Sequence, residues 1–375
     1  MITETTENIP QAETEKTDLK KLHPEELEKY CEQAGLKGYR ADQIFQWLYQ
    51  KGVSGFDEMT NLSKDLRSRL GAEARVSRLK IHSQQKSSDG TIKFLFELDD
   101  ESGDKIEAVL IPDFYPDGVP NRLTVCVSSQ VGCVFGCSFC ATGKMGFYRN
   151  LTHGEIVDQI QIINGIAEEE YGKGITNIVY MGMGEPLHNY RAVVTSAEII
   201  SNPLGLELSP RRITISTVGL PKQIRKLADE NRPFNLAISL HAADDEKRNE
   251  IMPINKSMDL SELRDALVHY YRRTQKGVTY EYILFDEFND HPEDARKLAA
   301  ITQWIPSKVN IIMYNRVEGV QLKRAREERL DRFMRVLVSK EVTATVRRSR
   351  GDDIDAGCGQ LAIREDGRRG KTIAE

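Results

Sequence analysis

Long apolar runs are absent from this chain of 375 residues. A membrane-spanning helix needs about 20 consecutive apolar residues, and a secretory leader needs a shorter apolar core. The sequence contains neither pattern, so we expect a cytoplasmic protein with no membrane partner. Cysteine is also scarce, and most of the six cysteines gather at one place, which argues against a disulfide framework and for a reducing compartment. The sequence shows no internal repeat.

Large apolar side chains are nearly missing from residues 1–18, which carry five acidic residues and one lysine. This composition predicts a disordered acidic leader. Its local charge of −4 makes up most of the formal net charge of −5, so the remaining chain can have an anionic partner. Residues 316–350 contain eleven basic and five acidic residues and end in Arg347, Arg348 and Arg350. This basic stripe is compatible with phosphate binding and equally with a solvated helix face that carries its own ion pairs.

Hydrophobic periodicity divides the rest of the chain into four segments. Residues 19–74 have helical spacing and predict a small accessory domain, whereas residues 75–120 alternate as in an antiparallel β extension. Residues 121–350 alternate strands with amphipathic helices, which predicts an α/β fold, a partial (β/α)6 TIM-like barrel with its site at the carboxyl ends of the strands. Residues 351–375 form a C-terminal tail. The expected barrel strands are 123–128, 177–181, 212–217, 235–240, 279–284 and 309–314.

Three cysteines, Cys133, Cys137 and Cys140, follow the first expected barrel strand with Cys-x-x-x-Cys-x-x-Cys spacing. A closed zinc site needs a fourth ligand, usually from a second Cys or His pair, and the sequence has no such pair. Three thiolates on a short loop suit a four-iron cluster that keeps one iron open for chemistry. Zinc binding and buried free thiols are the alternatives.

Polar residues follow the other strands. Gly184 and Glu185 come after the second strand, where glycine allows close backbone approach and a carboxylate can bind an ammonium group. Each polar residue alone could be a helix N-cap, but together they predict a nucleoside cofactor site at one mouth. The further residues of this expected site are Ser216, Ser239, Leu240, His241 and Asn315.

Two more cysteines belong near this chemistry. Cys126 lies on the first barrel strand, and Cys358 stands between Gly357 and Gly359 in the tail. A cysteine flanked by glycines is sterically open and is typical of a reactive thiol. Cys31, within a helical apolar pattern, is interpreted as a core residue.

The segments IEAVLIP, CVSSQVGCVFGCSFCATG, NIVYMGMGEPLHN, LAISLHA and RGDDIDAGCGQLA resemble the dual-specificity ribosomal and transfer RNA adenine-C2 methyltransferases of the radical S-adenosylmethionine (SAM) superfamily. The resemblance covers residues 19–362. It implies one 4Fe-4S cluster on Cys133, Cys137 and Cys140, with SAM held by the strand-end residues named above. It also implies two RNA substrates: 23S rRNA at the peptidyl transferase centre, and tRNA at the adenine 3′ of the anticodon. An external electron donor such as flavodoxin or ferredoxin, and a monomeric enzyme, complete the expectation.

The resemblance also implies a reaction sequence. A first SAM methylates Cys358, and a second SAM, cleaved at the cluster, gives a 5′-deoxyadenosyl radical that removes hydrogen from this methyl group. The resulting carbon radical adds to C2 of adenine, Cys126 resolves the adduct through a transient disulfide with Cys358, and Glu107 accepts a proton. Without the resemblance Glu107 is interpreted as an exposed strand carboxylate. Radical chemistry suits the target, because C2 is an electrophilic carbon that polar SAM transfer does not methylate.

The sequence departs from the family pattern at two places, and two alternative functions remain open. Relatives carry Asn-Pro and a Gly/Pro-rich loop where this chain has NRVEGVQLKRAREERL, which we expect to be charged and helical, and the connection from Glu107 to Cys126 is long. A Cfr-like enzyme would methylate C8 of the same ribosomal adenine; Pro186 favours the C2 enzymes, because the C8 enzymes typically carry alanine there. A non-catalytic RNA-binding protein with a structural metal would explain the basic stripe and the helical segment, but not Cys126 and Cys358.

Overall fold

The computed structural model describes residues 16–100 and 102–363, and the chain forms two compact units, Met1–Ser77 and Arg78–Glu375. The expected leader therefore lies largely outside the described residues. Its last two residues differ from the prediction, because Thr17 and Asp18 form a short strand, β1, in parallel pairing with β2 (Ala74–Arg75).

The first unit is helical, as its periodicity predicts. Helix α1 begins at a proline and carries Glu26, whose carboxylate accepts the His23 N–H over 2.7 Å, and α3 is capped by the Ser63 hydroxyl. Leucines such as Leu27, Leu48 and Leu70 form its core together with aromatic side chains and with Cys31, which is buried as predicted. The helices are α1 (Pro24–Gln33), α2 (Tyr39–Gln46), which continues into a π-helical turn at Trp47–Lys51, and α3 (Lys64–Glu73).

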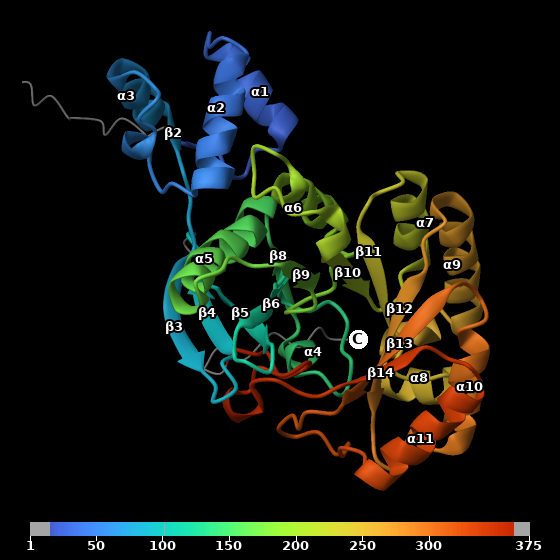
Figure 1. The fold of residues 1–375 in the computed structure, drawn as a ribbon. Helices are drawn as coiled ribbons and strands as arrows, with labels where there is room; N and C mark the ends of the chain where they lie inside the picture. The colour runs from blue at the N-terminus through green and yellow to red at the C-terminus, as the bar shows by residue number, and fades with distance from the viewer. Residues whose placement is uncertain (1–15, 101, 364–375) are drawn as a thin grey trace, which may run out of the picture. The chain divides into compact units, whose positions relative to one another are not determined.

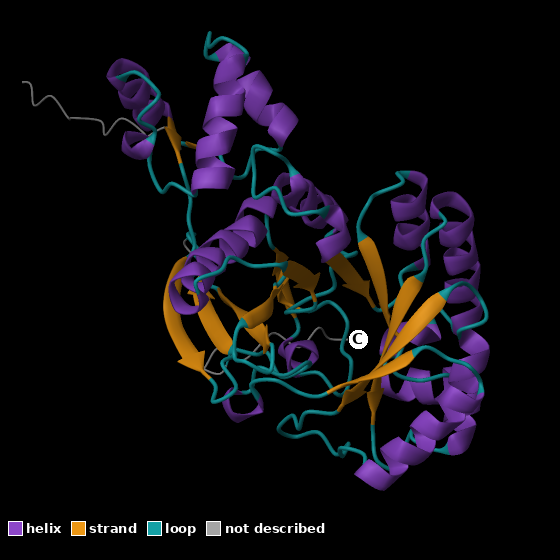
Figure 2. Ribbon diagram, in the orientation of Figure 1, coloured by secondary structure: helices purple, strands orange, loops and turns teal. Residues whose placement is uncertain are grey.

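The second unit is built on a ten-stranded sheet that curves as an open barrel (Figures 1 and 2). Seven strands, in the order β6-β9-β10-β11-β12-β13-β14, are parallel, and β3, β4 and β5 continue the sheet antiparallel beside β6. The strands are β3 (Lys80–Lys86), β4 (Ile92–Glu97), β5 (Lys105–Phe114), β6 (Pro120–Cys126), β9 (Asn177–Tyr180), β10 (Ile213–Thr217), β11 (Asn235–Ser239), β12 (Val278–Leu284), β13 (Ser307–Met313) and β14 (Ala344–Arg347).

All six expected barrel strands are present, and two features differ from the prediction. The seventh parallel strand, β14, lies at the sheet edge with mostly exposed side chains, so its sequence lacks the apolar pattern of a buried strand. The β extension is not a separate sheet, because β5 pairs with β6 from Val109 to Phe114 and joins the extension to the barrel.

Helices cover the outer face of the sheet (Figure 1). Helix α5 begins with a capping box of Thr152 and Glu155 and ends at Gly172 in the left-handed conformation. No described helix is long and apolar enough to cross a membrane. The helices are α4 (Ala141–Met145), α5 (His153–Tyr171), α6 (Tyr190–Ser201), α7 (Pro221–Asp229), α8 (Asp245–Ile251), α9 (Leu260–Thr274), α10 (Pro292–Ile301) and α11 (Glu327–Ser339).

The loop after β13 is irregular from residue 314 to residue 326, and α11 begins at Glu327. The helical character that we expected after Asn315 therefore starts fourteen residues after the last residue of β13, later than the charge pattern indicated.

Candidate active site

The cysteine loop begins directly after β6 and is shaped by a small hairpin of β7 (Gln130–Gly132) and β8 (Phe147–Asn150). Gly132 has φ +72°, and a Cβ there would lie 1.9 Å from the Gly146 carbonyl oxygen. The same oxygen accepts the Cys133 N–H over 2.9 Å. Only glycine fits this close crossing, so Gly132 directs the following chain into the barrel mouth.

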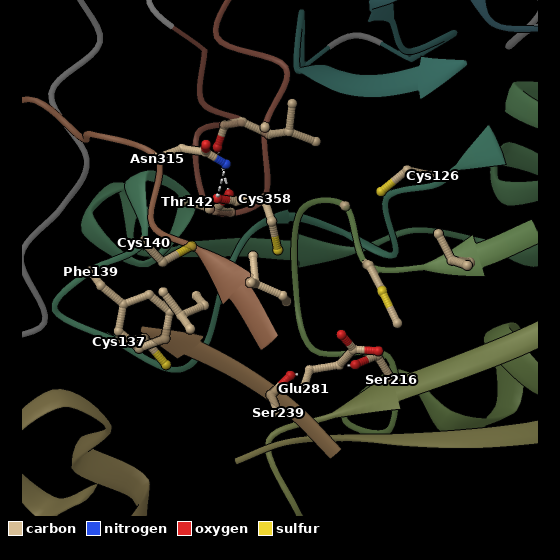
Figure 3. A pocket seen from close by; sticks show the side chains of 18 of the residues that line it. Cys126, Cys137, Phe139, Cys140, Thr142, Ser216, Ser239, Glu281, Asn315 and Cys358 are labelled. Carbon is tan, nitrogen blue, oxygen red and sulfur yellow. Dashed lines mark hydrogen bonds between the residues drawn. The ribbon is translucent and has the colours of Figure 1, made fainter. Parts of the chain in front are cut away.

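Cys133, Cys137 and Cys140 all line one cavity at the carboxyl ends of the strands. Figure 3 shows Cys137 and Cys140 in this cavity. Burial raises the pKa of each thiol, for Cys133 to about 12, because the thiolate is poorly solvated there. Cys137 is close enough to both partners for their charges to raise its pKa further. Three gathered soft donors that would be neutral without a metal fit an iron–sulfur cluster, whose binding displaces the protons.

The described residues contain no group of three His, Cys, Asp or Glu side chains placed to hold one metal ion. This spacing is compatible with a cluster, because each cysteine then binds a different iron and the three sulfurs need not converge on one point.

Glu185 lies beside the cysteine loop and is buried in the same cavity lining. Its carboxylate accepts the N–H groups of Val218 and Leu187, each over 2.9 Å. Burial raises the pKa of Glu185 to about 7, against the effect of these hydrogen bonds. The preceding Gly184 has φ +98°, and a Cβ there would lie 2.5 Å from the Gln130 Cβ, so glycine is required. A buried carboxylate in this position is suited to a cationic ligand group.

The other expected cofactor residues come together, with one exception. Ser216, Ser239, His241 and Asn315 line the cavity, and the Ser216 and Ser239 hydroxyl oxygens are 3.4 Å apart. Leu240 is fully buried and does not line it; its carbonyl instead accepts from an arginine on α8. Burial lowers the pKa of His241 to about 3, so the imidazole is neutral, and its Nδ1 accepts the Ile283 N–H over 3.2 Å.

Cys126 and Cys358 lie at this cavity although more than two hundred residues separate them in sequence. Cys358 is exposed, and its sulfur points into the cavity between Cys140 and Cys126 in Figure 3. Burial raises the pKa of Cys126 to about 12, and the charge of Cys358 raises it further. Although Cys358 is exposed as a residue, the surrounding cavity walls desolvate its thiol and raise its pKa to about 11. Both cysteines are free, so no disulfide joins them here.

Glu107 is placed differently from the expectation. It is only 5% exposed, in contrast to the exposed strand carboxylate that its sequence alone suggested. It lines a second, smaller pocket with Lys93, Asp353 and Ala362, and not the cavity that contains Cys126 and Cys358.

Sequence reasoning missed two buried charged residues. Arg248 on α8 is 1% exposed and donates to the carbonyls of Val218 over 2.6 Å and Leu240 over 3.2 Å, which ties the ends of β10 and β11 together. Glu281 on β12 lines the cavity, accepts the Asn310 side-chain N–H over 2.8 Å and lies 3.7 Å from the Arg347 guanidinium. The sequence could have indicated Glu281, because it is a charged residue inside the apolar run TYEYIL. No comparable sequence pattern indicated Arg248.

The basic stripe divides into two parts. On its helical side, Arg326 and Arg329 pair with acidic residues that follow β12, as a solvated helix face would. At its end Arg347, Arg348 and Arg350 line the cavity, where an anionic substrate would enter. The ion pairs support the solvated-face interpretation for the helical part of the stripe, and phosphate binding by the three terminal arginines stays a prediction.

Comparison with known proteins agrees with this geometry. Residues 17–76 match the ribosomal RNA large subunit methyltransferase N-terminal domain, and residues 127–299 match the radical SAM superfamily, whose members use a 4Fe-4S cluster and SAM. A probable dual-specificity RNA methyltransferase RlmN from Salinibacter ruber is 51% identical over 350 residues, which cover 93% of this chain and 94% of that protein. The dual-specificity RNA methyltransferase RlmN of Pelobacter propionicus is 44% identical over 359 residues, 96% of this chain and 99% of that protein.

A crystal structure of a radical SAM methyltransferase from Sphaerobacter thermophilus superposes with a TM-score of 0.84 and 42% identity, covering 92% of this chain and 99% of that one. This match confirms the predicted partial barrel. The chain belongs to the RlmN family of dual-specificity RNA methyltransferases, within the radical SAM superfamily.

Proposed function

We propose that this chain methylates C2 of adenine in 23S rRNA, at the peptidyl transferase centre, and in tRNA, at the adenine 3′ of the anticodon. The observation that supports it most strongly is the meeting of Cys126 and Cys358 at the cavity lined by the three cluster cysteines. A methyl group carried on Cys358 would lie beside the cofactor site, and the second thiol would be in place to release the product.

The cavity residues bind and orient the cofactor. Cys133, Cys137 and Cys140 would hold the cluster, Glu185 would bind the ammonium group of SAM, and hydroxyls such as Ser216 would hydrogen-bond its nucleoside part. When bound, the cluster and SAM supply a 5′-deoxyadenosyl radical that can remove a hydrogen atom from the methyl group on Cys358. The neutral His241, whose Nδ1 accepts the Ile283 N–H, would contribute a fixed, uncharged side chain to the cofactor site.

Cys126 would resolve the covalent link between Cys358 and the RNA. After the adduct has given up the unpaired electron of the radical addition, the Cys126 thiolate would attack the Cys358 sulfur, and the sulfur–sulfur bond would form as the sulfur–carbon bond breaks. The freed carbon would take up a proton to become the methyl group, and the hydrogen at C2 would leave as a proton. The Arg347 guanidinium favours the required thiolate, since it lowers the pKa of Cys126 against the larger effect of burial. The disulfide must then be reduced by an external thiol before the next turnover.

The helical unit supports RNA binding by this enzyme. Lys21, Lys37, Lys51 and Lys64 are exposed on it and available for phosphate contacts, while Lys20 is buried. Extruding an adenine into the barrel costs a few kcal/mol, which contacts spread over the RNA must offset. We further propose a monomeric cytoplasmic enzyme whose cluster receives its electron from a flavodoxin or ferredoxin.

The proposed function is tested with Cys126→Ala, reconstituted with cluster and incubated with SAM, a chemical reductant and an rRNA fragment. We expect a covalent protein–RNA adduct, seen as a slow-migrating band that nuclease removes, because the link to Cys358 can form but cannot be resolved. The matched control is Cys126→Ala/Cys358→Ala, which should give no adduct.

Nucleoside mass spectrometry of RNA treated with the wild-type enzyme is the second readout. We expect 2-methyladenosine. Production of 8-methyladenosine would assign the chain to the C8 reaction, and free unmodified RNA together with the absence of an adduct would contradict the proposed roles of both cysteines.

A further inference from the structure

The tail that carries Cys358 runs between the two pockets. Leu361 lines the cavity with the cysteines, and the next residue, Ala362, lines the smaller pocket with Glu107. Register places Glu107 on the same face of the sheet as Cys126, because Val109 is opposite Cys126 and two residues from Glu107. The tail therefore separates Glu107 from the cavity that its face of the sheet would otherwise reach.

Both carboxylate oxygens of Glu107 are engaged. Oε2 accepts the Ala362 backbone N–H over 2.9 Å, and Oε1 lies 3.2 Å from the Lys93 ammonium. The side chains of Glu107 and Lys93 are 7% and 12% exposed, so water screens this pair only weakly. One carboxylate oxygen is thus bound to the backbone of the tail and the other to a lysine of β4, so the carboxylate links the tail to the sheet.

The cluster helix α4 holds the tail from the opposite side. The Ala141 N–H donates to the Gly359 carbonyl over 2.8 Å, and the Thr142 hydroxyl donates to the Leu361 carbonyl over 2.5 Å. The peptide groups that follow Cys358 are thus bound in turn by α4 and by Glu107, and Cys358 is the residue directly before this bound stretch.

We propose that Glu107 is a positioning residue, which together with Thr142 holds the tail so that the Cys358 thiol stays in the cavity. The inference rests on the proposed function only for the role of Cys358 as methyl carrier. The placement of the tail by Glu107 can be measured without any RNA or turnover.

Two substitutions at one position separate the roles. Glu107→Gln keeps an oxygen that can accept the Ala362 N–H but removes the basic carboxylate, whereas Glu107→Ala removes both. Thr142→Val tests the α4 side of the tail independently of Glu107. Glu97→Ala, in the neighbouring strand β4 with its side chain 48% exposed, is the matched control for loss of a carboxylate from the extension.

The first readout is amide hydrogen exchange of residues 351–363 in the protein without SAM. We expect exchange on the order of tenfold faster in Glu107→Ala and in Thr142→Val, the factor that loss of about 1.4 kcal/mol from a closed state produces. Glu107→Gln and Glu97→Ala should stay within about twofold of the wild type, since each keeps the hydrogen bond to Ala362.

The second readout is methylation of Cys358 by SAM, followed by the mass of the tryptic peptide. Methylation of Cys358 should be slowed in Glu107→Ala and rescued in Glu107→Gln. If the Gln and Ala variants both keep a protected tail and a methylated Cys358 but form no methyladenosine, Glu107 is a base and the proposal is wrong. If both variants instead lose the same thermal stability while hydrogen exchange of the tail is unchanged, Glu107 stabilises the fold in general. This outcome would also overturn the proposal.

Discussion

The cavity and the smaller pocket each contain a buried glutamate, and the two carboxylates differ in whether a cation lies beside them. None of the described residues forms an ion pair with Glu185, and burial raises its pKa to about 7. Glu107 has the Lys93 ammonium beside it. A buried carboxylate with no cation is unfavourable in the empty protein, which indicates that a ligand supplies the charge, whereas a carboxylate with its own cation belongs to the structure.

The largest effect is expected when the ligand-facing carboxylate is neutralised. Glu185→Gln should weaken SAM binding to the cluster-loaded protein by about 100-fold or more, because a charge-assisted contact with an ammonium group is lost from a site that water does not screen. Equilibrium dialysis measures it. Glu207→Gln, on the loop before β10, is the surface control, and an unchanged affinity of the Glu185 variant would contradict the assignment.

The same substitution should stabilise the empty protein at high pH. Because the folded-state pKa of Glu185 is raised from 4.5 to about 7, its favourable contribution to folding is complete below about pH 4.5 and is lost as the pH rises through 7. In urea unfolding of the cluster-free proteins, the free energy of unfolding of Glu185→Gln should therefore exceed that of the wild type by an amount that grows between pH 5 and 8, up to about 3 kcal/mol. Parallel stability curves for the two proteins would show that the carboxylate is not strained by burial.

The paired carboxylate should respond in the opposite way. Lys93→Met removes the ammonium that lies 3.2 Å from the buried Glu107 carboxylate and should lower the free energy of unfolding by about 2 kcal/mol at pH 8, less than for a fully buried pair because Lys93 keeps some exposure. Lys93→Met/Glu107→Gln should recover most of that loss, since the buried carboxylate charge is then removed too. A double-mutant cycle with zero coupling energy would remove the distinction between the two glutamates.

The smallest effect is expected at the far end of the tail, where no ion pair is involved. The Asp89 carboxylate accepts the Gly351 N–H over 3.0 Å and the Thr91 N–H over 2.9 Å. Asp89→Asn leaves one of these donors without its acceptor and should cost about 0.5 kcal/mol, because Asp89 is partly exposed and water replaces the lost bond. Hydrogen exchange at Gly351 should rise a few-fold, and a change as large as that in Glu107→Ala would show that the two ends of the tail are equally important.

The parts of the site that the sequence predicted are those encoded locally. Cys133, Cys137 and Cys140 lie within eight residues of one another, and Glu185 follows its strand within a few residues, so strand periodicity was enough to place them at the barrel mouth. Leu240 was included with its neighbours Ser239 and His241, and it is buried because successive residues at a strand end face opposite sides.

Other features depend on contacts between distant segments, which no local pattern reveals. The position of Glu107 is decided by the path of the tail, and the bond to Ala362 joins residues 255 positions apart. Arg248 is interpretable only when the ends of β10 and β11 are brought to it. Strand β14 pairs along one edge only and keeps exposed side chains, so its sequence resembles a loop.

The late position of the tail in the chain also has a consequence during synthesis. Cys126 and the cluster cysteines leave the ribosome more than two hundred residues before Cys358, an interval on the order of ten to forty seconds at bacterial rates. The barrel can fold in that time, whereas the tail finds its partners on β5 and α4 only after they exist. Because Cys358 is synthesised so much later than Cys126, the two thiols cannot form a premature disulfide while the barrel folds.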